Sequence, residues 1–327
     1  MEYNDITARC TFGGKTMSKD YRVLLYYKYV DMPDYEEYAA EHLRFCKENE
    51  LKGRIIVAPE GINGTVSGTV EQTERYMNYV KQDPRFEDLW FKIDESDEHT
   101  FKKMFVRPKQ ELVTWRLDDE IDDNPNHLTG QYLSPKEFHD ALLDEDTIVI
   151  DGRNDYEYEI GHFRNAIKPG VQSSREFPEW IDENLEEYKD KRVITYCTGG
   201  VRCEKLTGIL MNKGFKDVAQ LHGGVVNYSQ DEEVQGRLWD GKLYVFDERI
   251  SIRANHTDED VVIASCHHCG TTEDRYINCS NPECNRQYVC CTECEEKHEA
   301  ACTTECREHP RNRWPNIKET YADKKAQ

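Results

Sequence analysis

Features that point to a membrane-bound or secreted protein are missing from the sequence. It contains no apolar run that approaches the roughly 18 residues of a membrane-spanning helix. The N-terminal stretch MEYNDITARC has no apolar segment like that of a signal peptide, so we expect a cytoplasmic protein without membrane contact. Glycine-rich fingerprints for a flavin, a nicotinamide or a nucleoside triphosphate are also missing. The sequence therefore shows no site for an organic redox cofactor and identifies no reductant.

Positive charge is scarce. The 327 residues include 43 Lys and Arg against 64 Asp and Glu, and the net charge is −21. Such a surface repels a polyanion at long range, so binding of nucleic acid requires a local basic patch. Candidates for this patch are Arg9, Lys15, Lys19, Arg22, Lys102, Lys103, Arg107 and Lys109. The alternative is that these side chains are scattered over the surface and simply solvated.

Cysteine, by contrast, is abundant and unevenly distributed. Nine of the 13 cysteines lie within residues 266–306. In a chain without a signal peptide, we expect reduced thiols that serve metal binding or catalysis. The spacings C-x2-C, C-x4-C, C-C-x2-C and C-x3-C are typical of tetrahedral zinc sites. The nine residues are Cys266, Cys269, Cys279, Cys284, Cys290, Cys291, Cys294, Cys302 and Cys306.

We predict a Cys-rich metal-binding module over residues 257–315 that holds two structural zinc ions. A segment this short does not fold on a hydrophobic core of its own, so metal binding would stabilise it. Interleaved ligand sets are one option. Either Cys290 or Cys291 is then surplus, and His267, His268 or His298 is an alternative ligand. An iron–sulfur cluster is the less favoured alternative.

The first part of the chain alternates between strand and helix patterns. Runs of β-branched and aromatic residues predict strands, and apolar residues at helical spacing predict helices. The predicted elements are strands at 22–30, 53–58, 65–68 and 89–93, a turn at 59–64, a helix after residue 33, and a helix from Thr69 to about Gln82. The order βαββαβ is that of a ferredoxin-like (acylphosphatase-like) α+β sandwich, which we place at residues 20–95.

A different pattern begins at Ser134, which forms a capping box with Glu137. The predicted elements are a helix at 135–143, strands at 147–150, 192–196 and 218–221, and a helix at 204–213 that ends at Gly214. Two of the strands are continuously apolar and lead directly into Asp151 and Cys197. This alternation indicates an α/β domain with a parallel sheet, which we place at residues 131–230. Sites in such domains gather at the carboxyl ends of the strands.

The remaining segments are predicted to connect these units. Residues 96–130 are acidic and irregular, apart from 104–115, and bridge the two domains. Residues 231–256 form a hairpin linker with Asp240 and Gly241 at its turn. The predicted fold class is therefore α/β overall, with an α+β domain first, a parallel-sheet domain in the centre and a small Cys-rich module at the end.

Cys197 combines several features of a reactive thiol. It begins a loop that consists of Cys197, Thr198, Gly199, Gly200, Val201 and Arg202. The loop amides form an anion-binding nest and the following helix adds its positive N-terminus, and both lower the pKa of a thiol. The two glycines permit the tight backbone path. Arg202 adds a permanent positive charge for an anionic ligand, and we predict a nucleophilic thiolate at Cys197.

Five further residues are predicted to support this loop, namely Asp151, Arg153, Glu157, His162 and Cys203. Buried polar groups need hydrogen-bond partners, so we interpret Arg153, Glu157 and His162 as an internal polar network rather than as catalysts. Cys203 either packs at the start of the helix or resolves a persulfide or sulfenate on Cys197.

These residues resemble the signatures of the rhodanese family. The segment 151–162 (DGRNDYEYEIGH) resembles the family's D-x-R…E-[FY]-x-x-G-H pattern, and 221–224 (LHGG) resembles its closing element. The spacing from Cys197 to Arg202 is C-x4-R, as in sulfurtransferases, whereas protein tyrosine phosphatases have C-x5-R. The resemblance implies a rhodanese domain with sulfur chemistry at Cys197.

A larger part of the chain, residues 20–310, resembles one group of rhodanese-containing enzymes. The segments 58–68 (APEGINGTVSG), 105–113 (FVRPKQELV) and 197–205 (CTGGVRCEK) are similar to those of the rhodanese-containing tRNA uridine hydroxylases. The resemblance implies oxygen-dependent hydroxylation of the wobble uridine at C5 to 5-hydroxyuridine. Molecular oxygen is then the co-substrate, tRNA is the partner, and Cys197 is the essential cysteine.

The role of Cys197 within this activity stays open between two chemistries. Its thiolate adds to C6 of uridine and makes C5 nucleophilic, or a persulfide or peroxy-type sulfur carries the oxygen. An anticodon-loop base is already unstacked, so extruding it costs little. Tyr26 and Tyr27 are candidates for stacking on it, but one of the two must face the core. The alternative function is transfer of persulfide sulfur from Cys197 to a thiol or RNA acceptor, and no DNA partner is expected.

Overall fold

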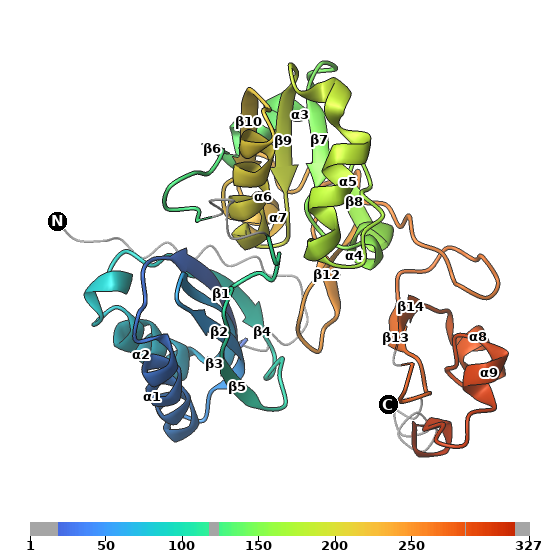
Figure 1. Cartoon of the computed structure of the whole chain (residues 1–327). Coiled ribbons are helices and arrows are strands. Elements are labelled where there is room, and N and C mark those ends of the chain that lie inside the picture. Colours follow the sequence, from blue (N-terminus) through green and yellow to red (C-terminus); the bar gives the residue numbers. More distant parts are fainter. Residues whose placement is uncertain (1–18, 118–123, 285, 318–327) are drawn as a thin grey trace.

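The computed structural model describes residues 19–117, 124–284 and 286–317, which form three units along the chain (Figure 1). The proposed basic residues Arg9 and Lys15 lie outside these residues. Within the described ranges, every helix is too short or too polar to pass through a bilayer.

The N-terminal unit is built on one five-stranded sheet with the order β4-β1-β3-β2-β5. Its elements are β1 (Tyr21–Tyr29), α1 (Tyr35–Glu48), β2 (Lys52–Ala58), β3 (Gly61–Thr69), α2 (Val70–Val80), β4 (Lys92–Ser96) and β5 (Met104–Pro108). The first four strands pair antiparallel in the ferredoxin-like order, as predicted, and β5 adds a parallel edge beside β2. Thr69 begins α2 with the full capping box.

Helices α1 and α2 cover one face of this sheet, and the other face is directed toward the central unit (Figure 1). Successive side chains of a strand point to opposite faces. In β1, Leu24 and Tyr26 are buried in the core under the helices. The alternate residues Leu25 and Tyr27 reach the loop that begins at Cys197. Of the two tyrosines considered for stacking, Tyr26 therefore faces the core and Tyr27 faces the site.

The sequence prediction for residues 59–64 was wrong in part. Strand β3 already begins at Gly61, so the connection between β2 and β3 is limited to Pro59 and Glu60. Gly61 has a φ of +140°, and a Cβ there would lie 2.0 Å from the backbone oxygen of Lys28. This glycine therefore serves close approach of neighbouring strands rather than a turn. Strand β4 also begins later than predicted, and β5 lies within residues 96–130, the predicted connection.

The central unit contains a parallel sheet with the order β6-β10-β9-β7. Its strands are β6 (Gln131–Leu133), β7 (Ile148–Asp151), β9 (Arg192–Tyr196) and β10 (Asp217–Leu221), and its helices are α3 (Pro135–Leu142), α4 (Asp155–Ile160), α5 (Phe177–Asn184), α6 (Val201–Asn212) and α7 (Gly224–Gln230). The predicted capping box of Ser134 is present, and Gly214 after α6 has a φ of +93°. The predicted parallel sheet is confirmed.

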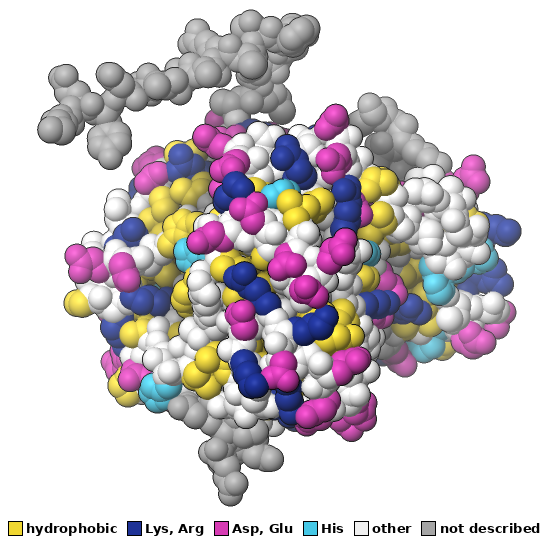
Figure 2. Space-filling view, turned by 90° about the horizontal axis from the view of Figure 1, so that it is seen from above, with side chains coloured by type: hydrophobic (Ala, Val, Ile, Leu, Met, Phe, Trp, Pro, Cys, Tyr) yellow, Lys and Arg dark blue, Asp and Glu magenta, His cyan; other side chains and the backbone are white. Residues whose placement is uncertain are grey.

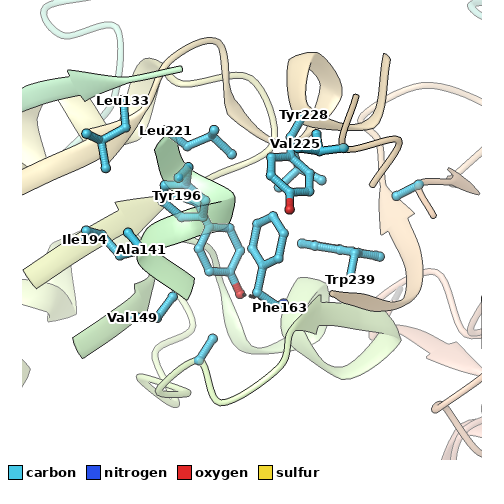
Figure 3. Packing of buried hydrophobic residues seen from close by; sticks show 14 of the residues in the cluster. Leu133, Ala141, Val149, Phe163, Ile194, Tyr196, Leu221, Val225, Tyr228 and Trp239 are labelled. Atoms are coloured by element: carbon cyan, nitrogen blue, oxygen red, sulfur yellow. Dashed lines mark hydrogen bonds between the residues drawn. The ribbon is translucent and has the colours of Figure 1, made fainter. Parts of the chain in front are cut away.

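A cluster of aromatic rings joins this sheet to a second, three-stranded sheet (Figure 3). The centroid of the Phe163 ring lies 4.8 Å from that of Tyr196, 4.9 Å from Tyr228 and 5.0 Å from Trp239, all in edge-to-face geometry. These rings come from β8 (Gly161–Phe163), β9, α7 and β11 (Trp239–Tyr244). Burial of four large rings fixes the second sheet against the first.

The predicted hairpin turn at Asp240 and Gly241 was wrong. Both residues lie inside β11, which pairs with β8 on one side and with β12 (Ser251–Arg253) on the other. The reversal of the chain occurs later, where the Val245 amide donates to the Ile250 carbonyl at 2.8 Å. A Cβ at position 241 would lie 2.1 Å from the backbone oxygen of residue 160. The glycine again serves close backbone packing.

The C-terminal module is small, and cysteine side chains make up most of its buried cluster. Its elements are β13 (Tyr276–Asn278), β14 (Gln287–Val289), α8 (Thr292–Lys297) and α9 (Thr304–Arg307).

On the surface of the molecule, positively and negatively charged side chains are mixed. Figure 2 shows Lys and Arg side chains interspersed with Asp and Glu over one face of the molecule, so the negative net charge is not gathered in one block there.

Candidate active site

Cys197 lies at the carboxyl end of β9, where the chain turns into α6. Its sulfur is completely buried and accepts a hydrogen bond from the backbone amide of Gly200 at 3.1 Å. Gly200 has a φ of +105°, which brings this amide back toward the sulfur. The loop is fixed from behind by α7, because the Val225 amide donates to the Cys197 carbonyl at 3.0 Å.

The environment of Cys197 favours the thiolate. Burial alone raises the pKa of this thiol, but the Cys203 thiol, the Arg202 charge and the amides of Arg202 and Gly200 together lower it to about 5. Cys203 responds in the opposite direction, since burial and the neighbouring thiolate raise its pKa. At neutral pH Cys197 is therefore ionised, and Cys203 is a neutral hydrogen-bond donor to it.

Arg202 does not stand free for an anionic ligand. Its two terminal nitrogens donate to the two oxygens of Glu157 at 2.6 and 2.8 Å, and one of them lies 3.3 Å from the Thr198 hydroxyl. Glu157 is completely buried, and the Arg202 guanidinium keeps the pKa of its carboxyl low despite the burial. The pair fixes Arg202 beside the loop, so that its charge acts on Cys197 from a rigid position.

A second buried pair lies below the loop. Arg153 donates to Asp151 at 2.6 Å and to the Gly161 carbonyl at 2.7 Å, and the Tyr196 hydroxyl donates to Asp151 at 2.8 Å. The polar network predicted for Arg153 and Glu157 is thus present as two pairs. His162 belongs to neither, because its ring stacks on Tyr158 and its Nδ1 lies 2.9 Å from the Tyr158 carbonyl oxygen.

A cavity of about 360 Å³ lies between the Cys197 loop and the helix-free face of the N-terminal sheet. The sheet contributes two cross-strand rows of side chains, Leu25–Thr65–Arg54 and Tyr27–Asn63–Ile56. Cys197, Thr198 and Arg202 line the opposite side. We call this space the Cys197 cavity. It exists only because two domains meet there.

Direct contacts hold the two walls of the Cys197 cavity together. The Tyr27 hydroxyl donates to Glu204 at 2.7 Å. Glu60 pairs with the buried Lys205 at 2.7 Å. The stretch APEGINGT therefore supplies the counter-ion for α6 and, through Asn63 and Thr65, part of the cavity wall.

Lys92 is a residue of this region that the sequence analysis missed. It is the cross-strand neighbour of Leu25, so both side chains point toward the Cys197 loop. Only 4% of Lys92 is exposed, and its ammonium lies 4.7 Å from the Trp90 ring centroid and 5.1 Å from that of Tyr27. Burial lowers its pKa to about 8. The sequence pattern that could have identified Lys92 is the alternation in residues 89–93 (LWFKI), which places Trp90 and Lys92 on the face opposite Leu89 and Phe91.

The cysteines of the C-terminal module form two interleaved groups of four. The groups are Cys266, Cys269, Cys291 and Cys294, and Cys279, Cys284, Cys302 and Cys306, and in each the four sulfurs lie within 4.8 Å of one another. The sulfurs of Cys269 and Cys291 are 3.8 Å apart, and those of Cys284 and Cys302 are 3.7 Å apart. A tetrahedral zinc ion with Zn–S bonds of about 2.3 Å places its sulfurs about 3.8 Å apart. Both groups are therefore shaped to hold a metal ion.

Cys290 is outside both groups and is completely buried. The histidines considered as alternative ligands are engaged elsewhere. His267 and His268 have ring nitrogens 3.0 and 3.1 Å from the carbonyl oxygens of Cys302 and Ala301. His298 stacks on His268 with the ring centroids 3.9 Å apart.

Part of the predicted basic patch lies close to the Cys197 cavity. Lys102 and Lys103 line a neighbouring cavity of about 590 Å³ that shares two residues, Arg54 and Phe246, with the Cys197 cavity. The Arg107 guanidinium lies 5.0 Å from the ring centroid of Phe105, which lines the same neighbouring cavity, and Lys109 is exposed after β5. Among the other candidates, Lys19 is exposed and Arg22 pairs with Glu74.

Comparison with known proteins matches this arrangement. A family model described as UPF0176 acylphosphatase like domain matches residues 21–112, a Rhodanese-like domain model matches 134–231, and a model described as Rhodanase C-terminal matches 240–307. A tRNA uridine(34) hydroxylase of Bacillus licheniformis is 60% identical over 296 residues, which cover 90% of this chain and 91% of the relative. A tRNA uridine(34) hydroxylase of Streptococcus gordonii is 59% identical over 301 residues, with 91% and 92% covered.

The chain belongs to the tRNA uridine(34) hydroxylase family. The family resemblance that the sequence motifs indicated is thereby confirmed. In this member of the tRNA uridine(34) hydroxylase family, the rhodanese-like domain carries Cys197, and the acylphosphatase-like domain completes the cavity in front of it.

The hydrogen bond from Cys203 predicts a specific effect of substitution. Cys203→Ala removes the donor and should raise the pKa of Cys197 from about 5 toward that of an ordinary thiol, whereas Cys203→Ser retains a donor and should change it less. The pKa is measured as the midpoint of the pH profile of alkylation of the Cys197 peptide, followed by mass spectrometry. Equal midpoints in Cys203→Ala and the unaltered protein would contradict this role of Cys203.

Proposed function

We propose that this protein hydroxylates C5 of the wobble uridine in tRNA anticodons, with molecular oxygen as co-substrate and 5-hydroxyuridine as product. The observation that carries the proposal is the position of Cys197 in the wall of a cavity of about 360 Å³, beside the Gly200 amide and the Arg202 charge that favour its thiolate. Two relatives that share about 60% of their residues with this chain bear the name of this activity. We place the reaction in the cytoplasm, where thiols stay reduced.

The Cys197 cavity suits a single flat base. Its volume falls at the lower end of the roughly 300–1,000 Å³ that small-ligand sites occupy. Leu25, Ile56 and Leu112 supply apolar walls, and Asn63 lines the same space. An asparagine amide offers one donor group and one acceptor, which complement the N3–H and O4 of uracil. We assign Asn63 to recognition of this edge.

In the proposed reaction the Cys197 thiolate adds to C6 of the base. The Sγ–C6 bond forms, and the electron pair of the C5–C6 double bond moves to C5 and the O4 carbonyl. C5 is then electron-rich and takes up the oxygen atom. Loss of the C5 proton and of the thiolate restores the double bond and regenerates Cys197.

The electron count defines what else the reaction needs. One atom of molecular oxygen enters the C5–H bond, and the other leaves as water after uptake of two electrons and two protons. A two-electron donor is therefore a required co-reactant. The permanent charge of Arg202, fixed by Glu157, favours the thiolate both before addition and after release.

The first test of this function is the Cys197→Ser variant. We expect it to lose at least about 100-fold of the hydroxylation rate, because an alcohol is not ionised near neutral pH. The assay measures 5-hydroxyuridine in an anticodon stem-loop by mass spectrometry under ¹⁸O₂, which should place one labelled atom in the product.

The same preparation tests the alternative of sulfur transfer. A sulfurtransferase would move sulfur from thiosulfate to cyanide in a Cys197-dependent way and would form no labelled 5-hydroxyuridine. These two results together would contradict hydroxylation and support sulfur transfer as the function. Thermal unfolding of Cys197→Ser serves as the control for folding.

We further propose that the C-terminal module binds two structural zinc ions. Each group of four cysteines offers four sulfurs within 4.8 Å of one another, and the module has few other apolar residues to stabilise it. Thiolate ligands suit zinc. The ions would hold β13, β14 and the two short helices together, and no step of the reaction depends on them.

The two neighbouring residues Cys290 and Cys291 provide a matched test of this assignment. Metal analysis of the purified protein should give two zinc ions per chain. Cys290→Ser should retain two, because Cys290 lies outside both groups, whereas Cys291→Ser should retain one. Loss of zinc in Cys290→Ser but not in Cys291→Ser would contradict the ligand sets, and iron in place of zinc would contradict the metal.

We also propose that Lys102, Lys103, Arg107 and Lys109 contact the tRNA backbone. Lys102 and Lys103 line the cavity of about 590 Å³ that shares Arg54 with the Cys197 cavity. Arg107 contacts the ring of Phe105 in the same lining, and Lys109 is exposed just after the same strand. Local positive charge is what an acidic protein needs in order to bind a polyanion.

Charge reversal tests this placement. Replacing Lys102, Lys103 and Arg107 together by glutamate should weaken tRNA binding. The plot of the logarithm of the binding constant against the logarithm of the salt concentration has a negative slope, and its magnitude should fall by about 2–3, since each phosphate contact contributes roughly 0.7–0.9. The control reverses Lys191 and Lys216, which precede the amino ends of β9 and β10, opposite the Cys197 edge of the sheet. Equal salt slopes for the two variants would contradict the placement.

A further inference from the structure

A second cavity lies on the other side of Tyr27. It measures about 340 Å³, and its lining includes Tyr27, Trp90, Lys92, Tyr132, Glu204 and His222. Because Tyr27 lines both this cavity and the Cys197 cavity, the two spaces are adjacent. Nothing in the reaction derived above uses the second cavity.

Exposed aromatic rings gather at this second cavity. Trp90 is 43% exposed and Tyr132 is 48% exposed, which is unusual for rings of this size. His222 lies between them, with its ring centroid 5.1 Å from that of Trp90 in stacked geometry and 5.4 Å from that of Tyr132. Burial and the nearby Lys92 lower the pKa of His222, so its ring is neutral at pH 7. The cluster therefore offers aromatic surface to a flat ligand.

The second cavity contains a buried ammonium group, that of Lys92, beside its aromatic rings. Lys92 is nine-tenths buried and, in the described part of the chain, makes no hydrogen bond or ion pair with a carboxylate. The lining also holds two carboxylates, and Lys92 interacts electrostatically with one of them, Glu204, and with the Cys197 thiolate. Asp88 pairs with Lys28. Glu204 accepts hydrogen bonds from Tyr27, Tyr132, Thr129 and Gln220.

The second cavity is also fixed to the reactive loop. A Cβ at Gly223 would lie 2.7 Å from the Trp90 ring, and one at Gly224 would lie 2.6 Å from the carbonyl oxygens of Cys197 and Thr198. The indole therefore packs on the chain segment that supports the Cys197 loop. A ligand placed on Trp90 is held in a defined position relative to Cys197.

We propose that Trp90, Tyr132 and His222, with Lys92, form a nucleotide subsite that binds a base adjacent to the wobble uridine in the anticodon loop. The inference rests on the proposed function, because the target uridine occupies the neighbouring cavity. Stacking on an aromatic ring accepts any base, and the lysine ammonium attracts the phosphate. The subsite would hold the loop in register while the target base enters the Cys197 cavity.

Affinity for an anticodon stem-loop tests the subsite. Trp90→Ala should weaken binding about ten-fold, within the range that stacking of one base contributes, and Trp90→Phe should retain most of the affinity. Leu143→Ala, which truncates an exposed apolar side chain on the rhodanese-like domain, is the control and should leave the affinity unchanged.

A double-mutant cycle distinguishes stacking from a general loss of structure. A stem-loop with an abasic nucleotide beside the wobble position should bind the unaltered protein more weakly but should bind Trp90→Ala no more weakly than the intact stem-loop does. If the loss of affinity caused by Trp90→Ala adds to the loss caused by an abasic nucleotide, on whichever side of the wobble position that nucleotide lies, the proposed subsite is contradicted. If the unaltered protein does not bind the intact stem-loop at all, the proposed function fails instead.

Tryptophan fluorescence provides a readout that does not depend on the stability of the alanine variant. Trp115, Trp239 and Trp314 are buried and Trp180 is partly buried, so Trp90 is the most accessible of the five tryptophans. Binding of the stem-loop should quench its emission, and the quenching should disappear in Trp90→Phe although binding persists. Quenching that is unchanged in Trp90→Phe would contradict contact between the base and Trp90.

Discussion

A buried anion needs compensating hydrogen-bond donors and positive charge, and this requirement organises the centre of the molecule. The Cys197 sulfur is completely buried, which by itself would keep it protonated. The Gly200 amide, the Cys203 thiol and the Arg202 charge reverse that effect. Arg202 in turn is held by the buried Glu157, so the charge does not move away from the sulfur.

The same site depends on two domains that are far apart in the sequence. The rhodanese-like domain carries the thiolate, and the helix-free face of the N-terminal sheet forms the opposite wall of the cavity. Ion pairing between Glu60 and Lys205 and hydrogen bonding between Tyr27 and Glu204 join the two. Breaking a buried pair leaves an uncompensated charge at a cost of about 3–5 kcal/mol. The contacts therefore act on both the shape of the cavity and the stability of the protein.

The sequence predicted the parts of the fold that local patterns encode. The strand that leads to Cys197, the helix start at Thr69, the capping box at Ser134 and the cysteine spacing all depend on residues close together in the chain. Glycine was harder to interpret. At Gly61 and Gly241 it allows two backbones to approach closely, a requirement that comes from distant residues, and both were taken for turn signals.

In the candidate site, too, local patterns predicted some residues, whereas the positions of others depend on contacts between distant parts of the chain. Cys197 and its loop were predicted because strand, glycines and arginine are contiguous. The position of Lys92 follows only from the pairing of β4 with β1, which aligns it with Leu25. Whether Arg202 is free or paired could not be read from spacing, because its partner Glu157 lies on another helix. The choice between Cys290 and Cys291 as the surplus cysteine likewise required the folded module.

The central claim is that the Cys197 thiolate adds reversibly to C6 of the wobble uridine. Addition makes C5 basic, so it should exchange the C5 hydrogen with solvent even when oxygen and reductant are withheld. Incubation of an anticodon stem-loop with the protein in anaerobic D₂O, followed by mass spectrometry, should show deuterium at C5 of the wobble uridine, and Cys197→Ser should show none. Absence of exchange in a preparation that forms 5-hydroxyuridine once oxygen and reductant are admitted would contradict the account.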